Sequence, residues 1–187
     1  MNRLKITELP IKGLKLIERQ SIGDNRGHLA RLFCADELRS AGWNKAISQV
    51  NYTYTAKKGT LRGMHYQHKP FAEMKLVSCI RGEVFDVAID LREESDTFLK
   101  VYSEFLSPDS GKALLIPEGF AHGFQALTDD VEMVYCHSMA YTPKAEAGLR
   151  ATDKVLNIKW PIPITEISQR DKSHPLIQKN TKGFIIL

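Results

Sequence analysis

The stretch MKLVSCIRGEVFDVAIDL, residues 74–91, contains two runs of apolar and β-branched residues that meet at Arg81-Gly82. Short runs of this kind, separated by a turn signal, predict β-strands that pair with each other. We therefore expect a β-hairpin over residues 74–91. Polar residues interrupt the second run at Asp86 and Asp90, so it alternates less regularly than a strand with one solvated face.

The same pattern recurs on both sides of this stretch. Residues 100–117 (KVYSEFLSPDSGKALLIP) and 122–141 (HGFQALTDDVEMVYCHSMAY) each contain two strand-like runs around a turn, and both predict a further hairpin. Residues 46–55 (AISQVNYTYT) alternate like a strand with one solvated face. The segment ADELRSAG, residues 35–42, is the best helix candidate because an acidic residue lies near its start and a glycine follows its end. Many short strands with few helices predict an all-β sandwich or barrel.

Size and composition favour one globular domain over residues 1–187. No linker, low-complexity tract or repeat divides the 187 residues, of which 43% are hydrophobic and 26% charged. The net charge of +4 arises without a basic run, which argues against nucleic acid as a partner. There is no secretion signal and no apolar run of membrane-spanning length, so we expect a soluble cytoplasmic protein. Three widely spaced cysteines, Cys34, Cys79 and Cys136, are expected to be reduced thiols.

The end of the chain carries a weaker structural signal. After Thr142 the apolar periodicity fades, and residues 142–163 are expected to form a loop that wraps around the barrel. The segment TEISQRDKSHP, residues 165–175, is polar and short, and it predicts a turn or a single helical turn.

Histidines raise the possibility of a metal site. The segment PEGFAH, residues 117–122, fits the second half of a metal-binding cupin motif, but the first half is broken. His65 and His68 are separated by two residues, so on a strand they would point to opposite faces and could not share an ion. Only His65, His122 and Glu73 would remain, which is an incomplete ligand set. We expect no functional metal.

Proton transfer is the alternative chemistry for these residues. Strict pleating would place Arg62 and His65 on opposite faces, unless Gly63 introduces a bulge. A histidine base is commonly oriented by a carboxylate, for which Asp171 is a candidate. A lysine on the next run, Lys75, could stabilise an enolate oxygen. Tyr135 and Tyr141 are available to return the proton, whereas four histidines are expected to be ordinary structural residues: His28, His68, His137 and His174.

Three segments together resemble the dTDP-4-dehydrorhamnose 3,5-epimerase family: GTLRGMHYQ (59–67), KLVSCIRGEVFDVAIDLR (75–92) and LLIPEGFAHGFQAL (114–127). The resemblance implies a cupin-like jelly-roll β-barrel with a few short helices. It also implies an isomerase that needs no metal or redox cofactor and inverts carbons beside the 4-ketone of a nucleotide-linked 6-deoxy sugar. Neither nucleic acid nor a membrane would be a partner.

The resemblance also implies roles for individual residues. His65 matches the catalytic base, Asp171 its dyad carboxylate, Tyr135 the tyrosine that reprotonates the opposite face, and Lys75 the lysine near the ketone oxygen. Further positions match residues that bind the sugar, the diphosphate or the base: Arg26, Gln49, Asn51, Arg62, His122, Tyr141 and Arg170.

Two departures from the family pattern concern the nucleotide. Where the family usually has an aromatic residue and a glutamate, this chain has Leu29 and Arg31. Arginine donates hydrogen bonds but cannot accept the N3–H of thymine. The pair therefore predicts a base richer in acceptors, as in a CDP- or GDP-linked sugar. The segment GLRATDKV, residues 148–155, also lacks the tryptophan-containing acidic run that is typical of the family at this point.

The resemblance further implies a homodimer in which N-terminal strands, about residues 1–33, cross to the partner. Arg26, Leu29 and Arg31 would then serve the partner's pocket. Three alternatives stay open at this stage: a non-catalytic sugar-nucleotide-binding barrel, a metal-dependent cupin oxygenase or isomerase, and a 3,4-ketoisomerase. The presence of Tyr135 beside the histidine–aspartate pair disfavours the last of these.

Overall fold

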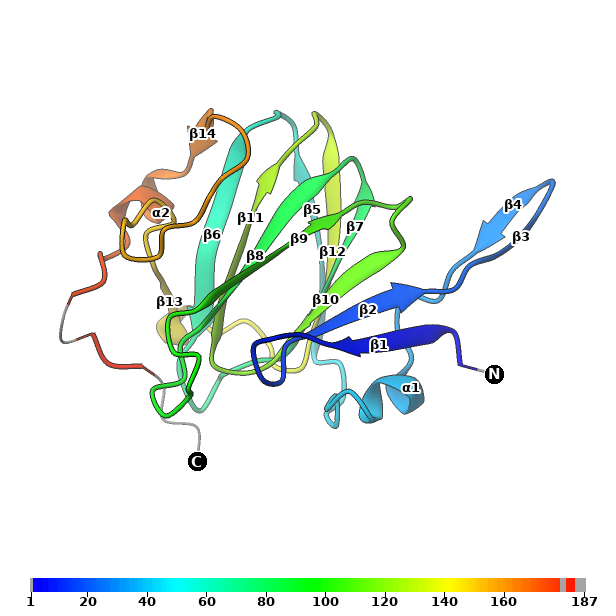
Figure 1. Ribbon diagram of the computed structural model, residues 1–187, viewed down its shortest axis with the longest axis horizontal. Helices are drawn as coiled ribbons and strands as arrows, with labels where there is room; N and C mark the ends of the chain where they lie inside the picture. The colour runs from blue at the N-terminus through cyan, green and yellow to red at the C-terminus, as the bar shows by residue number, and fades with distance from the viewer. Residues whose placement is uncertain (1, 179–180, 184–187) are drawn as a thin grey trace.

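Strands dominate the part of the chain that the computed structural model describes, residues 2–178 and 181–183 (Figure 1). The strands are β1 (Leu4–Glu8), β2 (Lys15–Arg19), β3 (Ile22–Asp24), β4 (Gly27–Leu29), β5 (Gln49–Thr55), β6 (Thr60–Gln67), β7 (Lys75–Arg81), β8 (Val84–Asp90), β9 (Val101–Leu106), β10 (Lys112–Ile116), β11 (Phe120–Ala126), β12 (Val131–His137), β13 (Glu146–Gly148) and β14 (Glu166–Ile167). The helices are α1 (Ala35–Arg39), α2 (Gln169–Ser173) and the 3-10 turn η1 (Pro143–Ala145).

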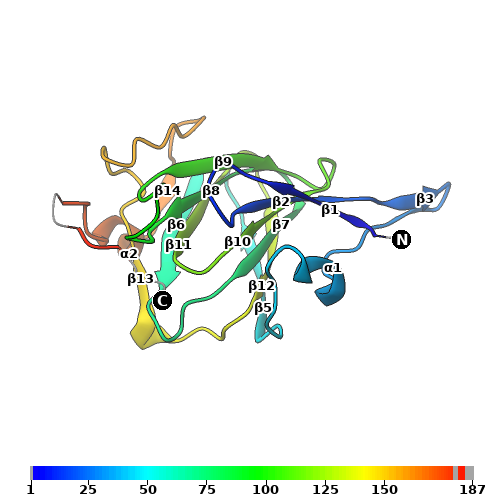
Figure 2. The ribbon, with the colours of Figure 1, turned by 60° about the horizontal axis from the view of Figure 1, so that its bottom comes forward.

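Two sheets form the body of the fold and face each other (Figures 1 and 2). The first has the order β1-β2-β10-β7-β12-β5, and the second has the order β13-β6-β11-β8-β9. Neighbouring strands are antiparallel except for β14, which pairs with β6 in parallel. This is the predicted all-β, cupin-like jelly roll with short helices.

The three predicted hairpins are wrong, although their strands are in the predicted places. β7 pairs with β10 and β12 in the first sheet, whereas β8 pairs with β11 and β9 in the second. The turn at Arg81-Gly82 therefore carries the chain from one sheet to the other. The same is true of the turns between β9 and β10 and between β11 and β12. Local turn signals mark where a strand ends, but they do not show which sheet receives the next strand.

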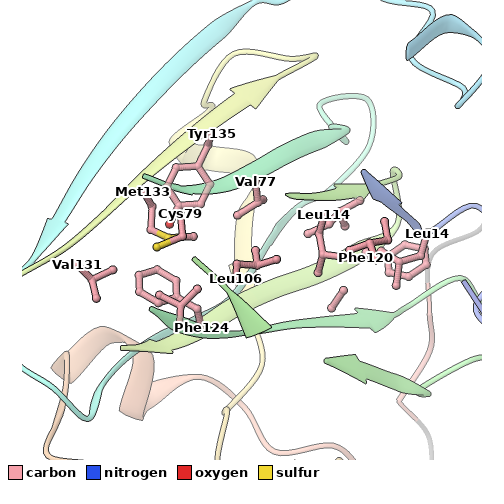
Figure 3. Packing of buried hydrophobic residues seen from close by; sticks show 14 of the residues in the cluster. Leu14, Val77, Cys79, Leu106, Leu114, Phe120, Phe124, Val131, Met133 and Tyr135 are labelled. Atoms are coloured by element: carbon pink, nitrogen blue, oxygen red, sulfur yellow. The ribbon is translucent and has the colours of Figure 1, made fainter. Parts of the chain in front are cut away.

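Apolar side chains fill the space between the sheets (Figure 3). Val77 and Cys79 come from β7, Leu114 comes from β10, and Phe124 reaches toward them from β11. Since these side chains are at most 2% exposed, they form the main core and hold the two sheets together.

The outer faces of both sheets are covered as well, and this explains the imperfect alternation of β8. Every residue of β8 is buried, because Phe85 and its neighbours on the outer face pack against Leu149, Leu156 and Trp160. The segment after β12 thus wraps around the barrel as predicted, but it is not all loop, because η1 and β13 lie within it and β13 pairs with β6. On the other sheet, Leu38 and Trp43 near α1 cover the outer face.

The N-terminal region has two parts. Helix α1 lies in the predicted segment, and Glu37 ties it to β1 by accepting the backbone N–H groups of Arg3 and Leu4 at 2.6 and 2.8 Å. The two-stranded ribbon β3–β4 projects from the body at the end opposite to α2 (Figures 1 and 2). Residues 22–29 of this ribbon are exposed, so it covers no part of the core.

The three cysteines carry free thiols, as predicted, with Cys79 and Cys136 buried and Cys34 half-buried. Burial raises the pKa of Cys79 to about 11, which keeps this thiol protonated. No helix within the described residues has the length and apolar character needed to span a bilayer.

Candidate active site

A cavity of about 950 Å³ opens between the two sheets. One wall is the inner face of β5, β7 and β12, the other is formed by β6 and β11, and α2 closes one side. All four predicted catalytic residues line it: His65, Lys75, Tyr135 and Asp171. Six predicted substrate-binding residues do so too: Gln49, Asn51, Arg62, His122, Tyr141 and Arg170. The fold thus brings together residues that lie more than 120 positions apart in the sequence.

A β-bulge in β6 decides which side chains reach this cavity. His65 pairs with His122 and Arg62 pairs with Phe124, so Gly63 and Met64 together lie opposite the single residue Gly123. The extra residue reverses the pleat, and Arg62 and His65 therefore face the same cavity. The structure therefore contains the bulge at Gly63 that the sequence allowed but did not require.

Only glycines allow this close approach of β6 and β11. Gly63 has a φ of +119°, and a Cβ atom there would lie 2.5 Å from the Cα atom of Gly123. A Cβ atom on Gly123 would lie 2.6 Å from the carbonyl oxygen of Arg62. Both contacts are shorter than packed atoms tolerate, so a side chain at either position would force the strands apart.

Asp171 and His65 form the central polar pair of the cavity. Ser168 caps the short helix α2 by accepting the backbone N–H of Asp171, which directs the carboxylate toward β6. Its Oδ1 lies 2.8 Å from Nε2 of His65, and its Oδ2 accepts the N–H of Gly63 at 3.2 Å. Because a carboxylate accepts, the ring N–H of His65 is used on Asp171, and the other ring nitrogen keeps a free lone pair.

The surroundings of Asp171 keep it ionised. Burial raises the pKa of Asp171, but the hydrogen bond and charge of His65, the Gly63 amide and the charge of Arg170 outweigh burial and lower the pKa to about 2. The carboxylate therefore stays negative in all but strongly acidic solution and can stabilise a proton that His65 acquires.

Tyr135 projects into the cavity from β12, on the wall opposite to His65. Tyr135 is only 8% exposed, and burial raises the pKa of its hydroxyl well above the usual value. The hydroxyl is thus protonated near neutral pH and can donate. The ring of His122 packs edge-on against it at 6.0 Å, while Nε2 of His122 lies 2.8 Å from Asp86.

Lys75 belongs to a second polar group, on the same wall as Tyr135. Glu73 binds Nζ of Lys75 at 3.1 Å through one carboxylate oxygen and Nδ1 of His137 at 2.7 Å through the other. Sequence reasoning treated His137 as an ordinary structural histidine, yet it lines the cavity. A usable signal was present, since His137 is two residues after Tyr135 on one strand and therefore shares its face.

One group of side chains has the residue types of a metal site. Ligand atoms of His65, Asp171 and His174 all lie within 4.8 Å of one another. The guanidinium of Arg170 already lies 3.2 Å from Nε2 of His65, and this positive charge opposes a second cation there. His122, which the sequence analysis weighed as a ligand, instead pairs with Asp86, as Glu73 does with His137 and Lys75.

The remaining predicted binding residues do not line this cavity. Arg26 lies at the tip of the β3–β4 ribbon and pairs with Asp24 at 2.6 Å. Leu29 is 70% exposed, and the guanidinium of Arg31 is hydrogen-bonded to Glu37. These three residues thus lie outside the cavity of their own chain, and the two arginines are paired with carboxylates.

The fold and the site define a cupin-like barrel with an acid–base pocket, and comparisons with known proteins identify the family. The model of the dTDP-4-dehydrorhamnose 3,5-epimerase family matches residues 8–179. The enzyme of that name from Shigella flexneri is 40% identical over 171 residues, which cover 91% of this chain and 93% of that protein. This chain belongs to the dTDP-4-dehydrorhamnose 3,5-epimerase family, which confirms the resemblance seen in the sequence.

Solved structures agree with this assignment. The enzyme from Bacillus anthracis, with TDP and PPi bound, superposes with a TM-score of 0.90 at 34% identity over 93% of this chain and 99% of that one. The dTDP-6-deoxy-D-glucose-3,5-epimerase from Legionella pneumophila, in complex with dTDP-4-keto-L-rhamnose, has a TM-score of 0.88 at 35% identity over 92% of each chain.

The bulge predicts the effect of one methyl group. Gly63→Ala should be destabilised by about 2–4 kcal/mol, because it combines an unfavourable φ with a clash against Gly123. Urea denaturation would measure the loss. Gly42→Ala is the matched control, since Gly42 also has a positive φ, +98°, but has open space around it. Equal losses in the two variants would contradict the steric role of the bulge.

Proposed function

We propose that this chain is an isomerase that inverts C3, C5 or both in a nucleotide-linked 4-keto-6-deoxy sugar. The observation that carries the proposal is the His65–Asp171 pair, joined at 2.8 Å on one wall of a cavity, with the protonated Tyr135 on the facing wall. Membership of the dTDP-4-dehydrorhamnose 3,5-epimerase family supports the substrate class.

His65 removes a hydrogen from a carbon next to the ketone. The ketone acidifies that hydrogen because the resulting negative charge moves onto oxygen as an enolate. His65 takes the proton on the ring nitrogen that Asp171 leaves free, and the ionised carboxylate stabilises the imidazolium. The reaction moves protons only, so no electron carrier takes part in it.

Tyr135 and Lys75 complete the reaction from the other wall. The ammonium of Lys75 stabilises the enolate oxygen as it forms. Tyr135 then returns a proton to the opposite face of the carbon, which inverts it. A phenol with a raised pKa suits this step, since it is still protonated when the enolate is present.

Polar residues around the catalytic set would bind the rest of the substrate. Arg62 and Arg170 supply positive charge for the diphosphate. Arg62 is held by Thr55 and by the carbonyl of Tyr54, at 2.9 and 3.2 Å, and Arg170 is held by Glu146 at 3.0 Å. Sugar hydroxyls and the base would contact the remaining polar groups: Gln49, Asn51, His122 and Tyr141.

Hydrogen exchange with D₂O tests the assignment of acid and base. The wild-type protein should exchange the α-hydrogens of a 4-keto-6-deoxy sugar nucleotide for deuterium. NMR would measure this exchange at each carbon separately. His65→Ala should lower exchange by about 10²- to 10⁴-fold, because the base is lost. Tyr135→Phe should still exchange, with His65 returning the deuteron to the same face, but should yield little inverted product.

The same assay separates the alternative functions. A wild-type chain that binds the sugar nucleotide without exchanging any α-hydrogen would be a binding protein. Transfer of the keto group between C3 and C4 would identify a 3,4-ketoisomerase. Oxygen consumption or activity that depends on an added metal would identify the metal-dependent class.

We propose that residues 1–187 form one domain and that the functional unit is a homodimer, in which the N-terminal segment of each chain completes the pocket of its partner. The exposed β3–β4 ribbon supports this arrangement, because Arg26 and Leu29 at the ribbon and Arg31 just after it lie outside the cavity of their own chain. Sedimentation of the full chain should give the mass of two copies, and a monomer that exchanges substrate hydrogens would contradict the arrangement.

The nucleotide base is predicted from Leu29 and Arg31. These residues favour CDP or GDP over dTDP, whereas the names of the relatives favour dTDP. Calorimetry with the three nucleoside diphosphates measures the preference directly. Tighter binding of CDP or GDP, reversed toward dTDP in the double variant Leu29→Phe/Arg31→Glu, is the expected result. Tighter binding of dTDP by the wild-type protein would refute it.

A further inference from the structure

A continuous series of hydrogen bonds runs along the cavity wall formed by β5, β12 and β7. It starts at the backbone N–H of Tyr141, which donates to Oε1 of Gln49 at 2.9 Å. Gln49 donates through Nε2 to Oδ1 of Asn51 at 2.8 Å, and Nδ2 of Asn51 lies 3.4 Å from Nε2 of His137. Nδ1 of His137 lies 2.7 Å from Glu73, which also binds Lys75.

The direction of this series is set at both ends. A backbone N–H can only donate, and a carboxylate can only accept. Each amide therefore accepts on the Tyr141 side and donates on the Glu73 side. His137 must then carry its hydrogen on Nδ1 and accept from Asn51 on Nε2, so it is a neutral imidazole of one tautomer. The amide of Asn51 is held facing the cavity as a result.

Glu73 is the common end of the series and of Lys75. Its side chain is 8% exposed, and the side chain of Lys75 is 10% exposed. A buried ammonium without a counter-ion is costly, and Glu73 is the carboxylate that meets it. Burial raises the pKa of Glu73, but the hydrogen bond from His137 and the charge of Lys75 outweigh it and lower the pKa, which keeps the carboxylate ionised.

Other groups around Lys75 do not replace this counter-ion. On the neighbouring strands, Lys75 pairs with Ile116 of β10 and with His137 of β12. Across the cavity, its Nζ lies 3.5 Å from the carbonyl oxygen of His65. The cavity walls also carry Arg62, Tyr66, His122, Tyr135, Tyr141, Arg170 and Lys172. Their three other carboxylates already have partners: Asp171 is bonded to His65, Glu146 to Arg170 and Tyr141, and Glu166 to Lys57.

We propose that Glu73 and His137 are positioning residues of the reaction. Glu73 holds Lys75 as an ammonium where the enolate oxygen forms, and through His137 it holds the Asn51 amide toward the same cavity. This inference rests on the proposed function, because it assigns Lys75 to the developing oxyanion. Besides His65–Asp171 and His122–Asp86, it gives a role to a third histidine–carboxylate pair, on the sheet facing His65–Asp171, which orients donors and leaves proton abstraction to His65.

The proposal predicts a change in the pH profile of kcat. In Glu73→Gln, no negative charge meets the buried Nζ of Lys75, so the charged form of this side chain is less favoured than in the wild-type protein. Since the ammonium is the active form, kcat should be lost at a lower pH than in the wild-type protein. At neutral pH kcat should fall by roughly 10- to 100-fold, with KM close to wild type, because the interaction strengthens in the transition state. Glu73→Asp keeps the charge and should recover part of the activity.

Glu104→Gln is the matched control. Glu104 binds Lys112 at 2.9 Å through one oxygen and accepts the hydroxyl of Tyr102 at 2.8 Å through the other, so it has the same kind of partners, but it lies outside the cavity. Its pH profile should match that of the wild-type protein. An unchanged profile in Glu73→Gln, or an equal shift in Glu104→Gln, would overturn the proposal.

NMR of the substrate-free wild-type protein provides a test that does not depend on activity or on the folding of a variant. The ¹⁵N shifts of His137 should show a neutral ring with hydrogen on Nδ1, and Nζ of Lys75 should give the ¹⁵N signal of an ammonium at pH 7. Hydrogen on Nε2, or a Lys75 that is neutral near pH 7, would overturn the inference. Absence of α-hydrogen exchange by the wild-type protein would instead count against the proposed function.

Discussion

The close approach of two backbones, at Gly63 of β6 and Gly123 of β11, is the constraint on which the site depends. The extra residue in β6 reverses the pleat, so that Arg62 and His65 face one cavity instead of opposite sides of the sheet. The same bulge presents the N–H of Gly63 to Asp171, which in turn holds His65. A local irregularity of one strand thus connects the barrel, the C-terminal helix and the base. β-Bulges are common next to active sites, where they redirect a side chain.

The second constraint is electrostatic. Two histidine–carboxylate pairs, His65–Asp171 and His137–Glu73, face the cavity from opposite sheets. Asp171 and Glu73 are both buried but kept ionised by the partners that meet them. On one wall the pair leaves a ring nitrogen free to take a proton, whereas on the other the histidine is used at both nitrogens and holds an amide in place. Similar residues therefore acquire different roles, because the second hydrogen-bond partner of each imidazole differs.

Prediction from the sequence succeeded where the signal was local. The short alternating runs located strands β5 to β12, the ADELRSAG segment located α1, and the polar segment before Pro175 located α2. Motif resemblance also selected residues from distant parts of the chain that line one cavity. It failed for the three predicted hairpins, because at each of these turns the chain crosses from one sheet to the other. It also overlooked His137. The sequence shows that His137 is two residues after Tyr135 and so shares its face of the strand, but its pairing with Glu73 can be seen only once β7 and β12 are known to be neighbours.

The sequence by itself determined the class of fold, the family and the candidates for the acid–base residues, because apolar periodicity and motif composition are properties of short segments. Tertiary structure alone decided which sheet each strand joins, on which side of β6 His65 emerges, and which carboxylate meets which cation. Those properties depend on the bulge register and on contacts between residues far apart in the chain, such as Asp171 with His65. No local pattern of side chains carries that information, since it arises only when the two sheets close on each other.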